Sequence, residues 1–187
     1  MQASSELRAR ALVVHERLCA EYGCPIPYFH DLDPLSELVS SLLSHRTKNR
    51  DSGRAFRQLR ERFATWEAVR DARDWLESLT GVGPKTSAAV LLFSRLRMPA
   101  LPVDSHHHRV AQRLALIPEN ISVGPAHRLL EAQLPPDWTA QQVYDNHEAL
   151  MLHGQRCCYF RNPDCHRCAV LDLCPYGQRR MAALPAA

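Results

Sequence analysis

Apolar residues recur every three or four positions along much of the chain, which is the period of an α-helix. In the first such stretch they are Leu7, Ala11, Val14 and Leu18. The same period, with the breaks that Gly and Pro make between stretches, predicts a series of helices. They cover residues 6–19, 34–44, 51–63, 71–79, 85–95, 104–116, 124–134 and 140–153. No stretch alternates apolar and polar residues as a half-buried strand does, so we expect an all-α fold.

The break between residues 71–79 and 85–95 is a tight turn that contains Gly81, Gly83 and Pro84. Such a turn leaves backbone N–H groups exposed at the N-terminus of the second helix, and these groups suit a phosphate. Glycine permits a positive φ and a close approach of a phosphate backbone. An ordinary connection between two helices uses the same residues, so the turn alone leaves both interpretations open.

Lysine is scarce in this chain: of 23 basic residues, only Lys48 and Lys85 are lysines. Lys85 lies in the first turn of the expected helix, at the positive end of the helix dipole. A partly buried lysine there would have a lowered pKa and could act as the neutral amine of a Schiff-base nucleophile. A cation that only contacts phosphate would occupy the same position, and the residues do not separate the two roles.

The chain has 187 residues, enough for one or two domains with a buried core, and a formal net charge of +3. Residues 45–73 hold nine Arg or Lys against four Asp or Glu. That excess could attract a polyanion or form a solvated helix face. The longest apolar run, residues 88–93, is far shorter than the about 20 residues of a membrane span. We therefore expect no membrane partner.

Four of the seven cysteines lie close together near the C-terminus, separated by six, two and five residues. They are Cys158, Cys165, Cys168 and Cys174. Four thiolates so close in sequence can hold one iron–sulfur cluster or one structural zinc ion, and the spacing alone does not separate these. The first ten residues are polar and show no secretory signal. This favours metal binding in a reducing compartment over disulfide bonds.

Two short segments carry a resemblance to a known family. Residues 79–86 (LTGVGPKT) and residues 102–106 (PVDSH) are similar to the helix-hairpin-helix DNA glycosylases, most closely to the endonuclease III branch. In that family the lysine that ends the hairpin is the nucleophile, and the aspartate of a Val-Asp-Thr-His element assists it. The resemblance assigns these roles to Lys85 and Asp104, with Ser105 in place of the usual threonine. It assigns DNA contacts in the hairpin to Gly81, Gly83 and Thr86.

The cysteine spacing also resembles endonuclease III, whose four cysteines hold a [4Fe–4S] cluster. The resemblance therefore favours iron–sulfur over zinc and selects Cys158 over its neighbour as the first ligand. It leaves Cys157, Cys19 and Cys24 as unliganded thiols. In the family, basic residues of the loop between the first two ligands contact DNA phosphates, and Arg161 is placed to do so here. The metal would then stabilise the conformation of this loop and take no part in the reaction.

Several histidines could also suggest a metal site, beginning with the run His106, His107 and His108. Consecutive helical residues point about 100° apart, so three in a row do not face one ion. His106 matches the family histidine beside the aspartate, and we expect the other two to be packed or exposed to solvent. His147 and His153 lie on an apolar helix, where we expect them to be core histidines with satisfied hydrogen bonds.

The sequence departs from the family in two places. In residues 42–49 (LLSHRTKN), Arg46 stands where the family has a glutamine that enters the space left by the flipped base, and Asn49 replaces a common aspartate. Arg46 could still fill that space as a DNA contact. Residues 64–80 are too few for the further helices that the family has before the hairpin, including a wedge into the opposite strand. Either this lobe is shortened or a segment is absent near residues 72–73.

We therefore expect an all-α, two-lobed protein with the helix-hairpin-helix DNA glycosylase fold. Residues 27–98 would form a shortened helical barrel with the hairpin, and residues 1–26 with 99–187 would form the cluster lobe. The resemblance implies a bifunctional DNA glycosylase and AP lyase of base excision repair. It would remove an oxidised pyrimidine or another damaged base and cleave 3′ to the abasic site by β-elimination through a Lys85 Schiff base. We expect a monomer that acts on damaged double-stranded DNA in the cytoplasm of a bacterial or archaeal cell, at the nucleoid.

Two other functions remain open. A family member that binds damaged or abasic DNA with little or no catalysis would fit the changes at Arg46 and Asn49. An adenine-mismatch glycosylase shares the hairpin and the cluster, but it usually lacks the lysine and has a further C-terminal domain. Lys85 and the end of the chain at Ala187 argue against this second alternative.

Overall fold

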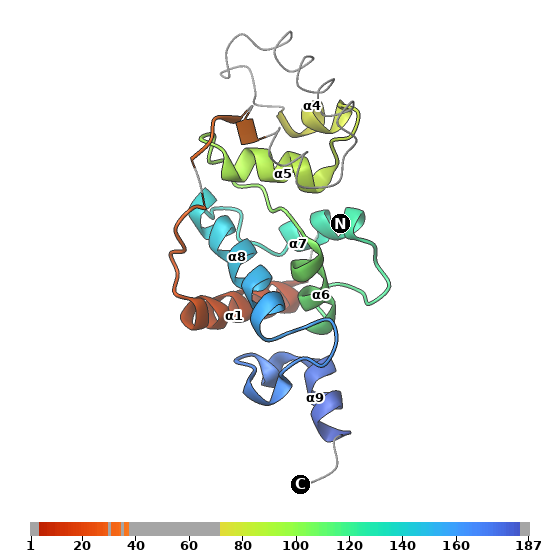
Figure 1. Ribbon diagram of the computed structural model, residues 1–187. Helices are drawn as coiled ribbons and strands as arrows, with labels where there is room; N and C mark the ends of the chain where they lie inside the picture. The colour runs from red at the N-terminus through yellow and green to blue at the C-terminus, as the bar shows by residue number, and fades with distance from the viewer. Residues whose placement is uncertain (1–3, 30, 35, 38–71, 184–187) are drawn as a thin grey trace. The chain divides into compact units, whose positions relative to one another are not determined.

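The computed structural model describes residues 4–29, 31–34, 36–37 and 72–183. All regular structure within these ranges is helical, which confirms the all-α prediction. The α-helices are α1 (Ser5–Tyr22), α4 (Ala72–Ser78), α5 (Pro84–Phe93), α6 (Ser105–Arg113), α7 (Val123–Glu131), α8 (Ala140–Arg156) and α9 (Pro175–Ala182). Two short 3₁₀ helices, η2 (Cys165–Arg167) and η3 (Leu171–Leu173), precede α9 (Figure 1). No helix in these ranges is both long and apolar enough to cross a membrane.

The structure contains one helix, α9, that was not expected from the sequence, and some of the expected helices lie outside the described residues. The sequence predicted no helix near α9 because its few apolar residues do not follow a helical period; Pro175 starts this helix. Most of the helix expected at 34–44 and the whole helix expected at 51–63 lie outside the described residues. The same holds for Arg46, Asn49 and the short stretch that precedes residue 72.

The chain divides into two compact units: Met1–Ile26 with Val103–Ala187, and Pro27–Pro102. In the first unit, α8 packs against both α1 and α6 (Figure 1). Apolar side chains form much of this contact, and full burial of a Val or Leu side chain contributes about 1.5–3 kcal/mol. The most deeply buried side chains of these three helices include Val14, Leu18, Val110, Ala111, Ala149 and Leu150.

Helices α6 and α8 approach each other closely at Gly154. A Cβ atom on this residue would lie 2.8 Å from the His106 Cβ and 3.2 Å from the His106 Cα. Arg109 of α6 donates from Nη2 to the Gly154 carbonyl over 2.7 Å. Glycine therefore lets the N-terminal half of α6 rest directly on the backbone of α8.

The second unit is built on the hairpin of α4 and α5. Gly81 has φ 91°, in the left-handed region that glycine adopts without strain. Gly83 is the N-cap of α5 and Pro84 its first residue, which agrees with the expected start of this helix. The two helices and their turn pack together through an apolar cluster that includes their own side chains Leu76, Leu79, Val82, Val90 and Leu91.

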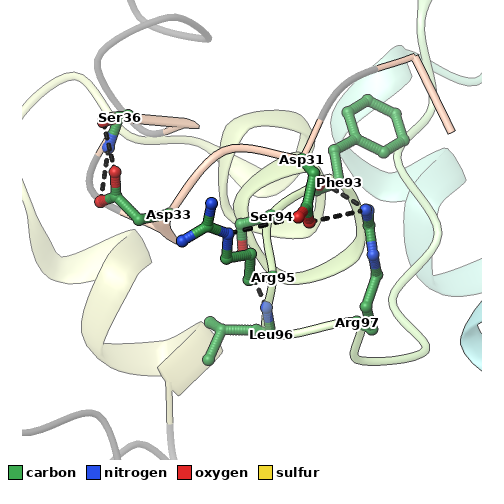
Figure 2. Close-up of polar contacts among 8 residues, drawn as sticks. All are labelled: Asp31, Asp33, Ser36, Phe93, Ser94, Arg95, Leu96 and Arg97. Atoms are coloured by element: carbon green, nitrogen blue, oxygen red, sulfur yellow. Dashed lines mark hydrogen bonds and ion pairs between the residues drawn. The ribbon is translucent and has the colours of Figure 1, made fainter.

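Charged contacts join the chain after α5 to the segment before residue 37 (Figure 2). Arg95 and Arg97 both pair with Asp31, over 3.3 and 3.2 Å, and the Arg97 guanidinium also lies 3.5 Å from the centre of the Tyr28 ring. Asp33 accepts a hydrogen bond from the Ser36 backbone N–H over 3.1 Å. Exposed ion pairs of this kind stabilise little individually, so the apolar cluster under the hairpin remains the main support of the unit.

The structure corrects one expectation about the cysteines. Cys19 and Cys24 were expected to be free thiols, but they form a disulfide with a Cα–Cα distance of 4.9 Å. Gly23 ends α1 in the left-handed conformation (φ 80°), and the Cys24 N–H donates to the Cys19 carbonyl over 3.1 Å. This turn folds the chain back, so that two cysteines five positions apart meet.

Candidate active site and metal centre

Lys85 is the second residue of α5 and is half-buried. No side chain caps the N-terminus of this helix at Gly83. The Thr86 side chain is buried, so a DNA contact at this residue would use its backbone N–H. A helix N-terminus without a side-chain cap is a suitable phosphate site, so the hairpin has the arrangement that the sequence predicted.

Asp104 belongs to the other compact unit and caps the N-terminus of α6. Its Oδ1 accepts a hydrogen bond from the His107 backbone N–H over 2.7 Å. This bond fixes the orientation of the carboxyl group. Lys85 and Asp104 thus each lie at a helix N-terminus of their own unit.

Glu148 is a neighbour of Asp104 that the sequence did not identify. Burial raises the pKa of Glu148 to about 7, and the negative charge of Asp104 adds to the rise. Glu148 lies on α8 between the buried residues His147 and Ala149. The one feature of the sequence that could have indicated Glu148 is that an acidic residue lies among apolar residues on a helix face.

The four predicted ligands line a single pocket in the first unit. We call Cys158, Cys165, Cys168 and Cys174 the four-cysteine set. Arg113 donates from Nη1 to the Cys158 sulfur over 3.2 Å, and the Gly177 N–H donates to the Cys174 sulfur over 3.3 Å. Other residues that close the pocket are Val110, Leu114, Pro163, Val170, Leu171 and Tyr176.

The sulfurs of this set are more widely spaced than the ligands of one tetrahedral zinc ion. Sulfurs bound to one tetrahedral zinc at about 2.3 Å lie about 3.8 Å apart. Among the described residues, the one group of three or more potential ligand atoms that all lie within 4.8 Å of one another is a different group. No three sulfurs of the four-cysteine set are therefore that close, although all four line one pocket.

The thiols of the set are poorly suited to carry charge without a metal. Burial raises the pKa of Cys165, Cys168 and Cys174, that of Cys168 to about 12. The other three thiolates raise the pKa of Cys174 further. A cationic centre such as iron or zinc would stabilise the thiolate forms of Cys165, Cys168 and Cys174.

The one close ligand group is formed by His153, Cys157 and Cys168, which we call the His-Cys-Cys group. The His153 Nε2 lies 3.5 Å from the Cys168 sulfur, and its Nδ1 lies 3.1 Å from the Tyr22 hydroxyl. The sequence correctly predicted a buried, hydrogen-bonded His153, but it did not place this ring or Cys157 beside Cys168. This part of the chain is thus compatible with a metal site.

The chain between the first two cysteines of the set, residues 158–165, forms a loop that α6 holds in place; we call it the cysteine loop. Arg113 donates to the carbonyls of Tyr159 and Phe160 over 2.7 and 3.0 Å, and Arg109 donates to the Cys158 carbonyl over 3.0 Å. Arg161 of this loop is exposed, as a phosphate contact requires. Arg109 and Arg113 lie on α6, more than 40 positions before the loop, and the sequence did not predict that they hold it.

No protein-family model matches the chain, but curated relatives do. Endonuclease III of Bacillus subtilis is 31% identical over 169 residues, which cover 89% of this chain and 74% of the relative. Endonuclease III of Escherichia coli K12 is 36% identical over 111 residues, 59% of this chain and 50% of the relative. The chain thus spans about half the length of the second relative and most of the first.

Solved structures have a similar fold. A trapped covalent intermediate of endonuclease III with DNA has a TM-score of 0.68 at 20% identity, covering 93% of this chain and 98% of that protein. A thermostable thymine-DNA glycosylase has a TM-score of 0.65 at 19% identity, covering 91% of this chain and 98% of that protein. The fold is therefore shared at low identity, and the Bacillus subtilis relative extends the similarity to the sequence. The chain belongs to the endonuclease III family.

Proposed function

We propose that this chain is a DNA glycosylase with AP lyase activity in base excision repair. Its substrate would be double-stranded DNA with a damaged base, and we expect an oxidised pyrimidine. The protein would act as a monomer. The proposal extends to this chain the chemistry of the family to which it belongs.

The observation that carries the proposal is the position of Lys85 in the hairpin. Gly81 makes the turn, Gly83 and Pro84 start α5, and Lys85 follows in its first turn. A phosphate on the helix N-terminus would hold the DNA backbone beside this residue. Arginine is permanently protonated, so in a chain with 21 arginines and two lysines the retained amine points to nucleophilic chemistry.

The reaction would begin with a flipped nucleotide. The neutral Lys85 amine would attack C1′ of the sugar, and the bond from C1′ to the base would break, with its electron pair leaving on the base. Asp104 would stabilise the positive charge that develops on the sugar. A nitrogen proton of Lys85 would neutralise the departing base. The bond from C1′ to O4′ would then break, O4′ would take a proton, and a protonated imine between C1′ and Lys85 would remain. Loss of a C2′ proton would break the bond from C3′ to oxygen, with the electron pair leaving on the phosphate oxygen, and the strand would be cleaved 3′ to the abasic site.

The four-cysteine set would hold a [4Fe–4S] cluster, as its wide sulfur spacing and its need for a cationic centre support. The cluster would stabilise the fold and take no part in the reaction. Arg109 and Arg113 would hold the cysteine loop so that Arg161 can contact a DNA phosphate. Gly81, Gly83 and Thr86 would supply the corresponding contacts from the hairpin through their backbone groups.

The test is borohydride trapping on duplex DNA that contains one abasic site. The parent chain should form a covalent adduct and nick the strand, whereas Lys85→Ala should lose both. Lys85→Arg is the matched control for charge: it should bind the DNA with near-parental affinity and still form no adduct. Trapping and nicking at the parental rate by Lys85→Ala would remove Lys85 from the mechanism.

The same assay separates the other functions. A parent chain that binds abasic DNA tightly and never nicks it would be a non-catalytic member. Release of adenine from a mismatch, without release of an oxidised pyrimidine, would identify the adenine-mismatch activity instead. Asp104→Asn should slow base release by about 100-fold or more, because one charge that stabilises a developing cation contributes about 3 kcal/mol.

A further inference from the structure

We propose that the His-Cys-Cys group is a second metal site, which binds one divalent ion such as zinc when the four-cysteine set holds no cluster. Cys168 belongs to both ligand sets, so the two sites would exclude each other. The inference stands apart from the proposed catalysis, since it rests on three side chains that the reaction does not use. It concerns a state of the chain that is free of its cluster.

The geometry of the three ligand atoms fits one tetrahedral ion. A ring nitrogen of His153 and the sulfurs of Cys157 and Cys168 all lie within 4.8 Å of one another. A zinc ion with bonds of about 2.05 Å to nitrogen and about 2.3 Å to sulfur separates those two ligands by about 3.5 Å. The distance from the His153 Nε2 to the Cys168 sulfur is 3.5 Å. Little movement would be needed to close the site.

Local structure holds two of the ligands side by side. His153 and Cys157 are four residues apart at the end of α8, where such residues share one helix face. The Cys157 N–H donates to the His153 carbonyl over 3.0 Å, which fixes their register. Cys168 ends η2, and its N–H donates to the Cys165 carbonyl over 3.2 Å. Each ligand therefore comes from a hydrogen-bonded turn.

Tyr22 supplies the partner that a zinc-binding histidine requires. Its hydroxyl lies 3.1 Å from the His153 Nδ1, whereas the other ring nitrogen, Nε2, lies 3.5 Å from the Cys168 sulfur. A hydrogen bond at Nδ1 orients the ring and leaves the Nε2 lone pair for a metal. The tyrosine comes from α1, 131 positions away from His153, so the arrangement depends on the folded unit.

Charge and burial also favour a divalent ion here. Two thiolates and a neutral imidazole carry two negative charges, which one zinc ion balances. His153 and Cys157 are only 3% and 5% exposed, so a charge in this position must be neutralised. A single zinc on four thiolates would keep two negative charges in a buried pocket. Three protein ligands leave one position open for water or another thiol.

The experiment uses cobalt as a spectroscopic substitute for zinc in the full chain, stripped of its cluster by a chelator under anaerobic, reducing conditions. Cobalt should produce thiolate charge-transfer absorption and the ligand-field bands of a tetrahedral site, and added zinc should abolish both. Cys157→Ser should weaken cobalt binding by at least about tenfold. Cys165→Ser is the matched control: it removes a buried thiol of the four-cysteine set and should leave cobalt binding unchanged.

Reconstitution with iron and sulfide should give the opposite pattern. Cys165→Ser should lose the visible absorption of the cluster, and Cys157→Ser should keep it. Tyr22→Phe should weaken cobalt binding by about 10-fold, because loss of a second-shell hydrogen bond costs that much, and should spare the cluster. If Cys157→Ser does not fold, Tyr22→Phe and His153→Gln replace it in the cobalt-binding test. The glutamine side chain of His153→Gln has nearly the volume of the histidine.

Two results would overturn the inference. The first is that cobalt does not bind the cluster-free chain. The second is that Cys165→Ser abolishes cobalt binding while Cys157→Ser does not, which would place the ion on the four-cysteine set. Neither result bears on nicking of abasic DNA, so the failure of this inference and of the proposed function remain distinguishable.

Discussion

Glu148 and His107 are two titratable side chains near the start of α6 whose pKa values are shifted by burial. Glu148 faces the negative charge of Asp104, and His107 is completely buried beside His147, with ring centres 5.9 Å apart. Within the described part of the chain, neither ring nitrogen of His107 has a hydrogen-bond partner. A buried polar group without a partner costs about 1–3 kcal/mol. Both residues therefore link the stability of the first unit to pH.

The first prediction concerns Glu148→Gln. Burial and Asp104 raise the pKa of Glu148 from 4.5 to about 7. Between those values the folded chain keeps a proton that the unfolded chain releases, so the free energy of unfolding falls as the pH rises from about 4.5 to 7. Glu148→Gln should remove this loss and gain about 1–2 kcal/mol at pH 8, after allowance for partial exposure of the side chain.

Urea unfolding at pH 5 and pH 8 measures this gain. Glu16→Gln, an exposed acid on α1, is the control and should change little at either pH. An equal effect of Glu148→Gln at both pH values would contradict the assigned ionisation. The same variant should also flatten the pH dependence of base release near neutrality, because it removes a charge that appears beside Asp104.

The second prediction concerns His107→Leu. Burial lowers the pKa of His107 well below 6.5, and the neighbouring His147 and His127 lower it further. The unfolded chain therefore binds a proton that the folded chain does not, and stability falls as the pH drops below 6.5. His107→Leu should reduce that acid sensitivity and stabilise the fold at pH 7 by about 1–3 kcal/mol.

Thermal unfolding between pH 5 and pH 8 tests this expectation. His108→Leu is the contrasting variant, because the His108 Nε2 lies 2.9 Å from the Ile121 carbonyl and its loss should destabilise. A parent chain whose melting temperature does not fall on acidification would show that His107 is not the sensitive group.

At the scale of elements, the packing of α6 on α8 positions Asp104 and the candidate metal centre. Helix α6 carries Asp104 at one end and Arg113 at the other, where Arg113 holds the cysteine loop. Helix α8 carries Glu148 and ends in the His-Cys-Cys group. A small change in the separation of these helices should therefore affect both the Asp104–Glu148 pair and the candidate metal centre.

The third prediction is that Gly154→Ala destabilises the fold by about 1–3 kcal/mol, since a Cβ there would lie 2.8 Å from the His106 Cβ and close to the α6 backbone. Gly124→Ala on α7 is the matched control: nothing lies within 4 Å of its added Cβ, so it should be neutral or slightly stabilising. Urea unfolding compares the two. Equal effects would mean that the contact between α6 and α8 is not tight.

At the scale of the whole molecule, one compact unit is assembled from both ends of the chain. Met1–Ile26 joins Val103–Ala187, and the side chains of Arg10 and Arg17 on α1 bind the Leu173 carbonyl and the Asp172 carboxylate. The segment between α8 and α9 has little regular structure, with only the short 3₁₀ helices η2 and η3, and it carries the four-cysteine set. The other unit, Pro27–Pro102, has its own apolar cluster under the hairpin.

The fourth prediction follows from this division. Removal of the metal by a chelator should expose the arginines of residues 156–180 to trypsin, because metal binding is coupled to the fold of the segment that carries the ligands. Cleavage within residues 81–95 should not increase. Mass spectrometry of a short digest identifies the order of cuts. Earlier cleavage in the hairpin than in the cysteine segment would contradict independent support of the two units.

The sequence by itself determined the features that depend on near neighbours. Helical periods, the hairpin turn and the cysteine spacing are set by residues within a few positions of one another, and these predicted the all-α class and the family. The same local reasoning placed Lys85 in the first turn of its helix. It failed for α9, whose start depends on Pro175 and whose apolar period is weak.

Only the tertiary structure decided which distant residues meet. It placed Glu148 beside Asp104, Tyr22 against His153, and Arg113 on the cysteine loop, across separations of 44, 131 and 45 or more positions. It also turned the expected free thiol Cys157 into a member of a close ligand group. The physical reason is that burial, charge and ligand distance are properties of packed helices, and a helical period fixes which face is buried but not which residue it meets.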